Sequence, residues 1–308
     1  MTGLASTPRR GPRRNTPRRG PRTGRVTPWL FLVPAVLIYA IFMLFPLGTA
    51  AQYSLYDWDG IGQAEFIGLS NYAAVFTDPE LYGSILHSLA LIVFFTVLPI
   101  LIAVAAASVA RRVSGRFGAV GRVVLFIPQV LPLAASALAW NWVYSSNGVI
   151  NQILEAVGLG ALARPWLGDF DTALPALGLV GTWVGVGFCL VLLLTGMAKI
   201  DPSLFEAAAL DGAGFFRELR SVTIPGIRRE IGVCVTVTVI SALQTFDLVY
   251  MTTRGGPGVS TMVPGLQIYQ LAFTKFQVGQ SSALGIVLMV IVVAIAATLQ
   301  AILRERDE

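Results

Sequence analysis

Few residues in this 308-residue chain could support covalent or metal chemistry. His87 is the only histidine, and the two cysteines, Cys189 and Cys234, both lie inside apolar runs. Because a metal site or a nucleophilic centre needs several such groups close together, we expect no metal site, no catalytic residue and no cofactor held by this chain. The two lysines, Lys199 and Lys275, do not close a glycine-rich phosphate loop, so ATP is not bound by that route.

Hydrogen-bonding chemistry is concentrated in the apolar segment 231–253. At 100° per residue, one arc of a helix over this segment is polar and the opposite arc is apolar. The polar arc contains Thr238, Ser241, Gln244, Thr245 and Asp247. Such a face inside a membrane turns toward protein or water, so it predicts either a pathway for a hydroxylated solute or hydrogen bonds between helices. The last four of these residues are the candidate pathway residues, and Asp247 lies near the end of its segment, where it can reach external water.

The polar connection 198–230 predicts two short helices joined by a sharp bend. Asp201 can cap a helix that begins at Pro202, or Ser203 and Glu206 can form a capping box instead.

The first helix of this connection is expected over 204–210, because Gly212 and Gly214 would end it. The second is expected over 215–222 and stops near Pro225. Both helices would protrude from the membrane.

The composition requires a membrane around these segments. Hydrophobic residues make up 55% of the chain and charged residues only 13%, about half the charged share of a soluble domain. Six stretches are long and apolar enough to span a bilayer. They are 28–51, 84–110, 123–145, 173–197, 231–253 and 283–303. The fold class is therefore all-α and integral to the membrane, with six transmembrane helices.

The charges between the spans predict the topology. If the spans alternate, one side carries nineteen lysines and arginines and the other carries three. By the positive-inside rule the basic side, which includes both termini, is cytoplasmic. Eight of these arginines lie in residues 1–27, a proline-rich tail that we expect to be disordered and to face anionic lipid rather than nucleic acid. Residues 28–303 form the transmembrane domain, and 304–308 form a cytoplasmic tail.

The basic start could also belong to a cleaved signal peptide. Its apolar stretch is longer than a signal core, however, and five more spans follow, so an uncleaved first span is the better interpretation.

The connection 198–230 resembles the EAA loop of bacterial ABC importer permeases. The residues that carry the likeness are Glu206, Ala207, Ala208, Asp211, Gly212, Gly214 and Pro225. In that family the loop forms coupling helices that dock into a cleft on the ATP-binding subunit. The resemblance implies that these seven residues couple the chain to its ATPase.

Three further segments resemble the external loops of carbohydrate permeases in this family. They are Ser54–Trp58 with Phe66–Tyr72, then Asn147–Asn151, and finally Thr253–Pro257 with Thr261, Ile268–Tyr269, Phe273 and Gly279–Leu284. The likeness runs from Pro28 to the C-terminus and is greatest to the first of two paired permeases, as in maltose and glycerol-phosphate systems. Arg254 departs from the pattern, because a small residue is usual before the Gly-Gly-Pro. The aromatic residues of these loops can equally anchor the chain at the membrane interface.

The resemblance implies a type I ABC importer permease fold and a bacterial cell membrane protein that transports a sugar or oligosaccharide. The implied partners are a dimer of ABC ATPase subunits that uses ATP and magnesium, a second permease subunit, and an extracellular solute-binding protein. The chain itself would not be an enzyme. Glycerol phosphate is an alternative substrate.

Two rival functions remain to be weighed. An ion-coupled secondary transporter needs intramembrane carboxylates, and only Asp247 is available. An intramembrane enzyme needs a nucleophile with a base, which His87 alone cannot supply.

Overall fold

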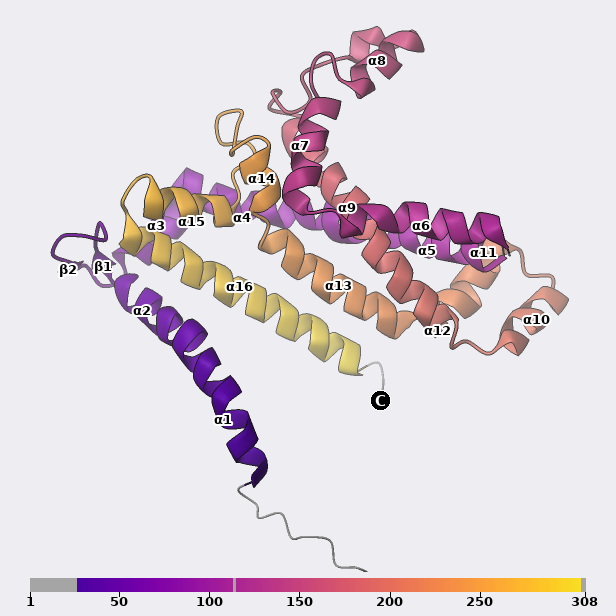
Figure 1. Ribbon diagram of the computed structural model, residues 1–308, viewed down its shortest axis with the longest axis horizontal. Helices are drawn as coiled ribbons and strands as arrows, with labels where there is room; N and C mark the ends of the chain where they lie inside the picture. The colour runs from indigo at the N-terminus through magenta and orange to yellow at the C-terminus, as the bar shows by residue number, and fades with distance from the viewer. Residues whose placement is uncertain (1–26, 113–114, 306–308) are drawn as a thin grey trace, which may run out of the picture. The chain divides into compact units, whose positions relative to one another are not determined.

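The computed structural model describes residues 27–112 and 115–305, and these residues are mostly helical (Figure 1). The predicted basic tail 1–27 therefore lies outside the described residues except for Thr27. The chain divides into two units between Gly48 and Thr49. The first unit holds α1 (Thr27–Tyr39), the π-helical turn Ala40–Leu44 and the beginning of α2 (Phe45–Tyr53).

The second unit begins with a small antiparallel sheet and continues as helices. The sheet pairs β1 (Tyr56–Asp57) with β2 (Glu65–Phe66). The helices up to the middle of the chain are α3 (Ser70–Thr77), α4 (Pro79–Ile92), α5 (Leu98–Arg112), α6 (Arg116–Val130), α7 (Leu133–Val143) and α8 (Val149–Ala156). The later helices are α9 (Ala173–Met197), α10 (Pro202–Leu210), α11 (Phe215–Glu218), α12 (Ile224–Gly226), α13 (Arg228–Leu243), α14 (Asp247–Met251), α15 (Pro264–Phe273) and α16 (Val278–Glu305).

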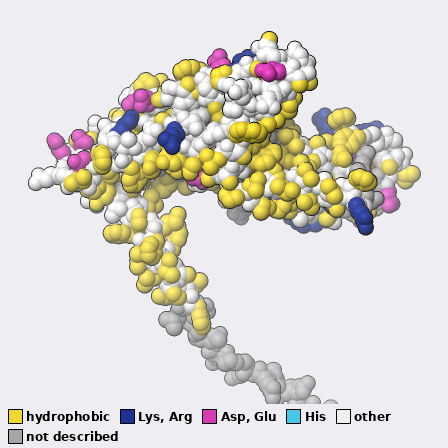
Figure 2. All heavy atoms as spheres, turned by 45° about the horizontal axis from the view of Figure 1, so that its top comes forward, with side chains coloured by type: hydrophobic (Ala, Val, Ile, Leu, Met, Phe, Trp, Pro, Cys, Tyr) yellow, Lys and Arg dark blue, Asp and Glu magenta, His cyan; other side chains and the backbone are white. Residues whose placement is uncertain are grey.

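Among the described residues, four helices are long and apolar enough to cross a membrane, and a bent pair makes a fifth candidate. The four are Phe31–Tyr53, Pro79–Arg111, Ala173–Met197 and Val278–Ile302. They correspond to the first, second, fourth and sixth predicted spans. Hydrophobic side chains cover a large part of the face shown in Figure 2, as expected for a surface in contact with lipid.

The third predicted span is not one continuous helix. Helices α6 and α7 meet at an angle of 102°. Pro132 lies between them and lacks a backbone N–H, and the residue before it, Leu131, has the extended conformation that a following proline favours (ψ 136°). The prediction of an unbroken helix over 123–145 was wrong because it treated this proline as tolerated.

The fifth predicted span is also broken. Helix α13 ends at Leu243, and α14 begins again at Asp247 after three residues without helical structure. No proline or glycine lies in this gap, so the sequence carries no local signal for it. Neither half is long enough to cross a membrane by itself, and the six continuous spans of the prediction are therefore not observed.

Three π-helical turns share one cause. They cover Ala40–Leu44, Val93–Val97 and Leu219–Thr223, and each ends two residues before a proline. A proline ring clashes with the carbonyl group four residues earlier and removes one hydrogen bond. A wider π turn separates these groups, so the helix continues past the proline.

Helix α9 lies at the centre of the second unit. Its side chains enter two buried apolar clusters, one shared with α7 and the α14 region and one shared with α5 and α13. Gly181 and Gly187 allow close approach, because a Cβ atom at Gly181 would collide with the Phe95 ring and one at Gly187 would lie 2.9 Å from the Leu125 carbonyl oxygen. Small residues at such contacts are typical of membrane helix packing.

Candidate functional site

Helix α10 begins at the residues that the sequence indicates. Asp201 is its N-cap, and the Asp201 carboxylate accepts a hydrogen bond from the Ser203 backbone N–H (2.9 Å). Hydrogen bonds from the Ser203 backbone and hydroxyl lower the pKa of Asp201, so the cap stays ionised at neutral pH. The alternative capping box is not formed. Within the part of the chain that the structure describes, the Glu206 carboxylate has no hydrogen-bond partner and is exposed.

The end of α10 shows why glycine follows Asp211. Gly212 has a φ angle of +70°, which is accessible to glycine at little cost. Its N–H donates to the Ala209 carbonyl oxygen (3.1 Å), and the Ala213 N–H donates to the Ala208 carbonyl oxygen (2.9 Å). This pair of bonds is a Schellman motif, and it turns the chain sharply after Leu210. The predicted helix and bend are therefore confirmed.

After the bend, a second helical segment starts at Phe215 with Gly214 as its N-cap, and it runs through to Gly226. The predicted start at residue 215 is confirmed, but the predicted end at 222 was wrong, because the π turn Leu219–Thr223 lets the helix continue past Pro225. Figure 1 shows α10 and α11 at one end of the second unit, with β1, β2 and α3 at the other. The loop exposes large apolar side chains, with Leu210 at 89% and Phe216 at 81% of their full accessible surface.

The other predicted coupling residues lie on the same surface. Ala207, Asp211 and Pro225 are exposed, and Ala208 is half-buried. Glu206, Leu210 and Phe216 are exposed as well, so the loop presents both carboxylates and apolar side chains to its surroundings.

The two ends of the loop 198–230 are held together. The Lys199 ammonium group lies 2.9 Å from a carboxylate oxygen of Glu230. Met197 and Ile227 are buried in the apolar cluster that α5, α9 and α13 share. The loop is therefore attached to the membrane helices by both an ion pair and buried apolar contacts.

Sequence reasoning missed a third attachment, at Arg111. This residue lies in the last turn of α5, and its guanidinium carbon is 3.5 Å from the centre of the Phe205 ring on α10. The same group forms an ion pair with Glu218 on α11. Arg111 therefore joins both halves of the loop to α5. In the sequence, Arg111 counts only as one of the basic residues that predict the topology. Its contacts were not foreseen because its partners, Phe205 and Glu218, lie about a hundred residues away.

A cavity of about 570 Å³ lies between the helices of the second unit. All four candidate pathway residues, Ser241, Gln244, Thr245 and Asp247, line it. Its other walls come from Phe95 before α5, from Gln129 on α6, and from the segment of α9 between Gly181 and Phe188.

The two helix breaks meet at this cavity. Leu131 and Leu133, which flank Pro132, line one side, and the non-helical residues 244–246 line another. Irregular backbone at membrane depth is tolerated where it faces protein or a polar cavity, and broken helices in transporters expose backbone groups to the substrate. The candidate pathway residues thus come from the end of α13, the gap after it and the first residue of α14. They do not share one regular helix face, which was the premise of the prediction.

Three polar side chains on the cavity wall are free to bind a solute. Gln129, Gln244 and Asp247 are exposed and have no hydrogen-bond partner among the described residues. Ser241 instead bonds to the Val237 carbonyl oxygen of its own helix (3.0 Å), and Thr238 bonds to the Thr96 hydroxyl (3.0 Å). Gln129 was missed, because its segment 123–145 has no polar face.

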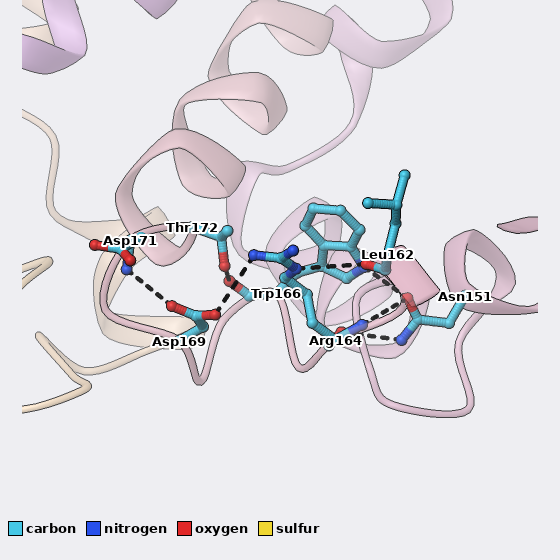
Figure 3. Close-up of polar contacts among 7 residues, drawn as sticks. All are labelled: Asn151, Leu162, Arg164, Trp166, Asp169, Asp171 and Thr172. Atoms are coloured by element: carbon cyan, nitrogen blue, oxygen red, sulfur yellow. Dashed lines mark hydrogen bonds and ion pairs between the residues drawn. The ribbon is translucent and has the colours of Figure 1, made fainter. Parts of the chain in front are cut away.

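The loop between α7 and α9 is organised by one buried amide (Figure 3). Asn151 is 2% exposed, and its amide nitrogen donates to the carbonyl oxygens of Ser145, Ser146 and Arg164. Its amide oxygen accepts hydrogen bonds from the Arg164 backbone and from the Trp166 indole N–H (2.8 Å).

The rest of this loop extends from that centre. The Thr172 hydroxyl donates to the Trp166 carbonyl oxygen (2.8 Å), and Arg164 lies 3.8 Å from the Asp169 carboxylate (Figure 3). These contacts hold the loop in one defined conformation.

The other two loop motifs also have structural roles. The Asn71 amide donates to the carbonyl oxygens of Ser54 (3.0 Å) and Tyr56 (2.9 Å) and so holds β1 against α3. In the later loop, the buried Thr261 hydroxyl contacts Thr253 and donates to the Gly256 carbonyl oxygen.

Arg254, which departs from the family pattern, has a φ angle of +52°, and its guanidinium carbon lies 5.9 Å from the centre of the Tyr250 ring. His87 has a packing role, with its Nδ1 bonded to the Met262 carbonyl oxygen (2.8 Å).

Comparison with known proteins agrees with this arrangement. Residues 99–306 match the family described as "Binding-protein-dependent transport system inner membrane component". The chain is 34% identical over 279 residues to the probable ABC transporter permease protein YurN of Bacillus subtilis, covering 88% of this chain and 94% of that protein. It is 33% identical to the diacetylchitobiose uptake system permease protein NgcF of Streptomyces coelicolor, covering 89% of this chain and 81% of that protein.

The fold has a solved counterpart as well. A chain in the crystal structure of a bacterial ABC transporter that imports the acidic polysaccharide alginate superposes with a TM-score of 0.76 at 20% identity, covering 91% of this chain and 95% of that one. The family match spans most of the chain, from α5 to α16, and includes both the loop 198–230 and the residues that line the cavity. The chain therefore belongs to the family of binding-protein-dependent transport system inner membrane components.

Proposed function

We propose that this chain is the permease subunit of an ATP-driven importer for a sugar or oligosaccharide. One observation carries the proposal: the loop 198–230 directly connects two of the helices that line the cavity, α9 and α13. Helix α9 lines the cavity between Gly181 and Phe188 and enters the loop after Met197. Helix α13 leaves the loop at Arg228 and lines the cavity at Ser241. A displacement of the loop therefore reaches both cavity walls through continuous helix.

The loop surface suits docking to a separate ATPase dimer. Glu206 and Asp211 supply carboxylates, and Leu210 and Phe216 supply exposed apolar contacts at the protruding end. Closing of ATP-bound subunits would move α10 as a rigid body, and the Arg111 and Lys199 contacts would carry this movement to α5, α9 and α13. ATP and magnesium are used by that partner, and this chain supplies no catalytic residue.

The cavity chemistry favours a neutral, hydroxylated solute. Gln129, Ser241 and Gln244 offer amide and hydroxyl groups, and among the described residues no lysine or arginine lines the cavity. An anion such as glycerol phosphate would meet the Asp247 carboxylate without a compensating cation. The relative NgcF is named for uptake of diacetylchitobiose, which supports a carbohydrate as the solute here.

The proposed arrangement has six membrane crossings, with the bent pair α6–α7 as the third and the broken pair α13–α14 as the fifth. Both termini and the loop 198–230 face the cytoplasm, as the distribution of basic residues supports. An extracellular solute-binding protein docks on the three outer loops, and a second permease subunit completes the pathway.

Ion-coupled secondary transport is the weaker candidate. It requires titratable groups that exchange protons or ions at the substrate site. Asp247 is the one ionisable residue on the cavity wall among the described residues, and such a transporter has no need of the exposed surface of α10.

The test is co-purification of the tagged chain from mild detergent with identification of its partners by mass spectrometry. We expect a second permease in an amount equal to this chain and the ATP-binding subunit in twice that amount. Leu210→Glu, which charges the exposed end of α10, should reduce the recovered ATPase by about tenfold, because the charge enters an apolar contact. Leu69→Glu is the matched control, since Leu69 is 69% exposed at the opposite end of the unit. A stable oligomer of this chain alone would contradict the proposal.

A further inference from the structure

Four aromatic side chains form a continuous row beside the cavity. They are Phe246, Tyr250, Tyr269 and Phe273, and they are called the aromatic row below. The rings of Phe246 and Tyr250 are stacked, with centroids 5.2 Å apart and planes 18° apart. Tyr269 lies 5.5 Å from Tyr250 and 5.4 Å from Phe273. The row therefore joins the gap before α14 to the far end of α15.

The two ends of the row have different surroundings. Phe246 lines the cavity next to Gln244 and Asp247. Phe273 is 70% exposed and Tyr269 is 36% exposed on the surface of α15. The row thus extends from the cavity wall at Phe246 to the exposed surface of α15 at Phe273.

Core packing explains the positions of only two of the four rings. Phe246 and Tyr250 pack against a buried apolar cluster, but Tyr269 and Phe273 belong to none of the apolar clusters found in the described residues. Helix α15 buries Leu266, Gln267 and Leu271 instead. Tyr269 and Phe273 are four residues apart, so they share a helix face directed away from this buried side.

We propose that the aromatic row is a stacking path for the transported carbohydrate, which enters at Phe273 and reaches the cavity at Phe246. A sugar ring has one face of apolar C–H bonds, and an aromatic face is an apolar surface that can cover it. Each contact is weak, and a series of weak sites allows a ligand to move from one to the next. The inference rests on the proposed function, because it requires a carbohydrate as the solute.

The experiment uses the complete transporter reconstituted in liposomes with its ATPase, partner permease and binding protein. The probe is an equimolar mixture of maltose, maltotriose, lactose and diacetylchitobiose, with glycerol 3-phosphate as a non-carbohydrate control. Imported solutes are quantified by mass spectrometry, and ATP hydrolysis is measured in the same vesicles. The readout is the number of sugar molecules imported per ATP hydrolysed.

Phe273→Ala and Tyr269→Ala should each lower sugar import per ATP by roughly three- to tenfold while ATP hydrolysis is unchanged, because each loses one stacking surface. Phe273→Tyr and Tyr269→Phe keep the ring and should retain import within about twofold. Phe76→Ala removes a ring that is 64% exposed on α3, outside the aromatic row, and serves as the matched control.

The outcomes separate the two claims. Phe273 is exposed, so its ring can be removed without disturbing the core. If Phe273→Ala imported as much sugar per ATP as the wild type, the stacking path would be overturned, but the proposal of a sugar importer would stand. A parallel fall in import and ATP hydrolysis would indicate a structural role and would also overturn it. A wild-type transporter that imports glycerol 3-phosphate and none of the sugars would refute the proposed substrate, and the stacking path with it.

Discussion

The Arg111 guanidinium carbon lies 3.5 Å from the centre of the Phe205 ring, and this contact joins the last turn of α5 to α10. The same guanidinium group pairs with Glu218 on α11. A cation over an aromatic ring contributes about 0.5–2 kcal/mol, and a partly exposed ion pair contributes up to about 1 kcal/mol. These contacts attach the loop 198–230 to α5, so we expect a movement of α10 to move α5 as well.

Replacing Gly212 by proline should stop transport. Proline fixes φ near −65°, whereas Gly212 has a φ of +70° and donates a hydrogen bond to Ala209. The bend after α10 would be lost, so uptake should fall by about tenfold or more, while the amount of protein in the membrane stays normal. Uptake and membrane content are measured in the same cells.

Gly212→Asn provides the control for that change, because asparagine tolerates the left-handed conformation. It should keep most of the uptake. Normal uptake by Gly212→Pro would remove the coupling role from this bend.

Gln244→Leu tests the polar wall of the cavity. It removes an amide that has no protein partner among the described residues, and the loss of one hydrogen bond to a solute corresponds to roughly a three- to tenfold fall in uptake. The ATPase subunits should remain bound and active. Gln63→Leu changes an exposed glutamine between β1 and β2 and should have no effect. Unchanged kinetics for Gln244→Leu would favour a packing role for this residue.

Asn151→Ala should loosen the outer loop 146–172. It leaves the Trp166 indole N–H and several backbone groups without their partner, at a cost of about 1–3 kcal/mol. Hydrogen–deuterium exchange of the backbone amides of 146–172, measured by mass spectrometry, reports on the opening of this loop. Exchange should be about tenfold faster, whereas Gln152→Ala, which loses one exposed bond to Asn147, should exchange at the wild-type rate.

Asp247→Asn separates ATP-driven import from ion-coupled transport. The substitution keeps the shape and removes the charge, so ATP-driven uptake should persist, with at most about a threefold change from the altered hydrogen bonding. Uptake should also be insensitive to a collapsed proton or sodium gradient. Complete loss of accumulation in Asp247→Asn would support the secondary-transporter alternative.

Much of the fold follows from local sequence. Four of the six spans were predicted within a few residues of the observed helices because a run of about twenty apolar residues has few alternatives in a membrane. The cap at Asp201 and the turn at Gly212 were predicted because capping depends on side chains within a few residues. The 102° bend at Pro132 was missed because several spans contain proline, and the sequence does not distinguish a tolerated proline from a breaking one.

The candidate site was less predictable. The gap at residues 244–246 contains no helix-breaking residue, so only tertiary packing can account for it. Gln129 lines the cavity together with residues far away in sequence, and Arg111 contacts a ring that is also far away in sequence. Neither residue therefore has a local sequence signal. The four candidate pathway residues do line one cavity, although the regular helix face from which they were inferred does not exist. Their role in transport remains a prediction.

The most direct test of the central claim is the number of ATP molecules hydrolysed per sugar imported by Arg111→Ala in liposomes that contain the complete transporter. We expect the ATPase to remain bound and to hydrolyse ATP at the wild-type rate, while sugar import falls by about tenfold, because the loop no longer moves α5. Arg116→Ala, an exposed arginine near the same end of the membrane helices, should behave as wild type. An unchanged ratio of ATP to sugar in Arg111→Ala would contradict the claim that α10 drives the cavity through these contacts.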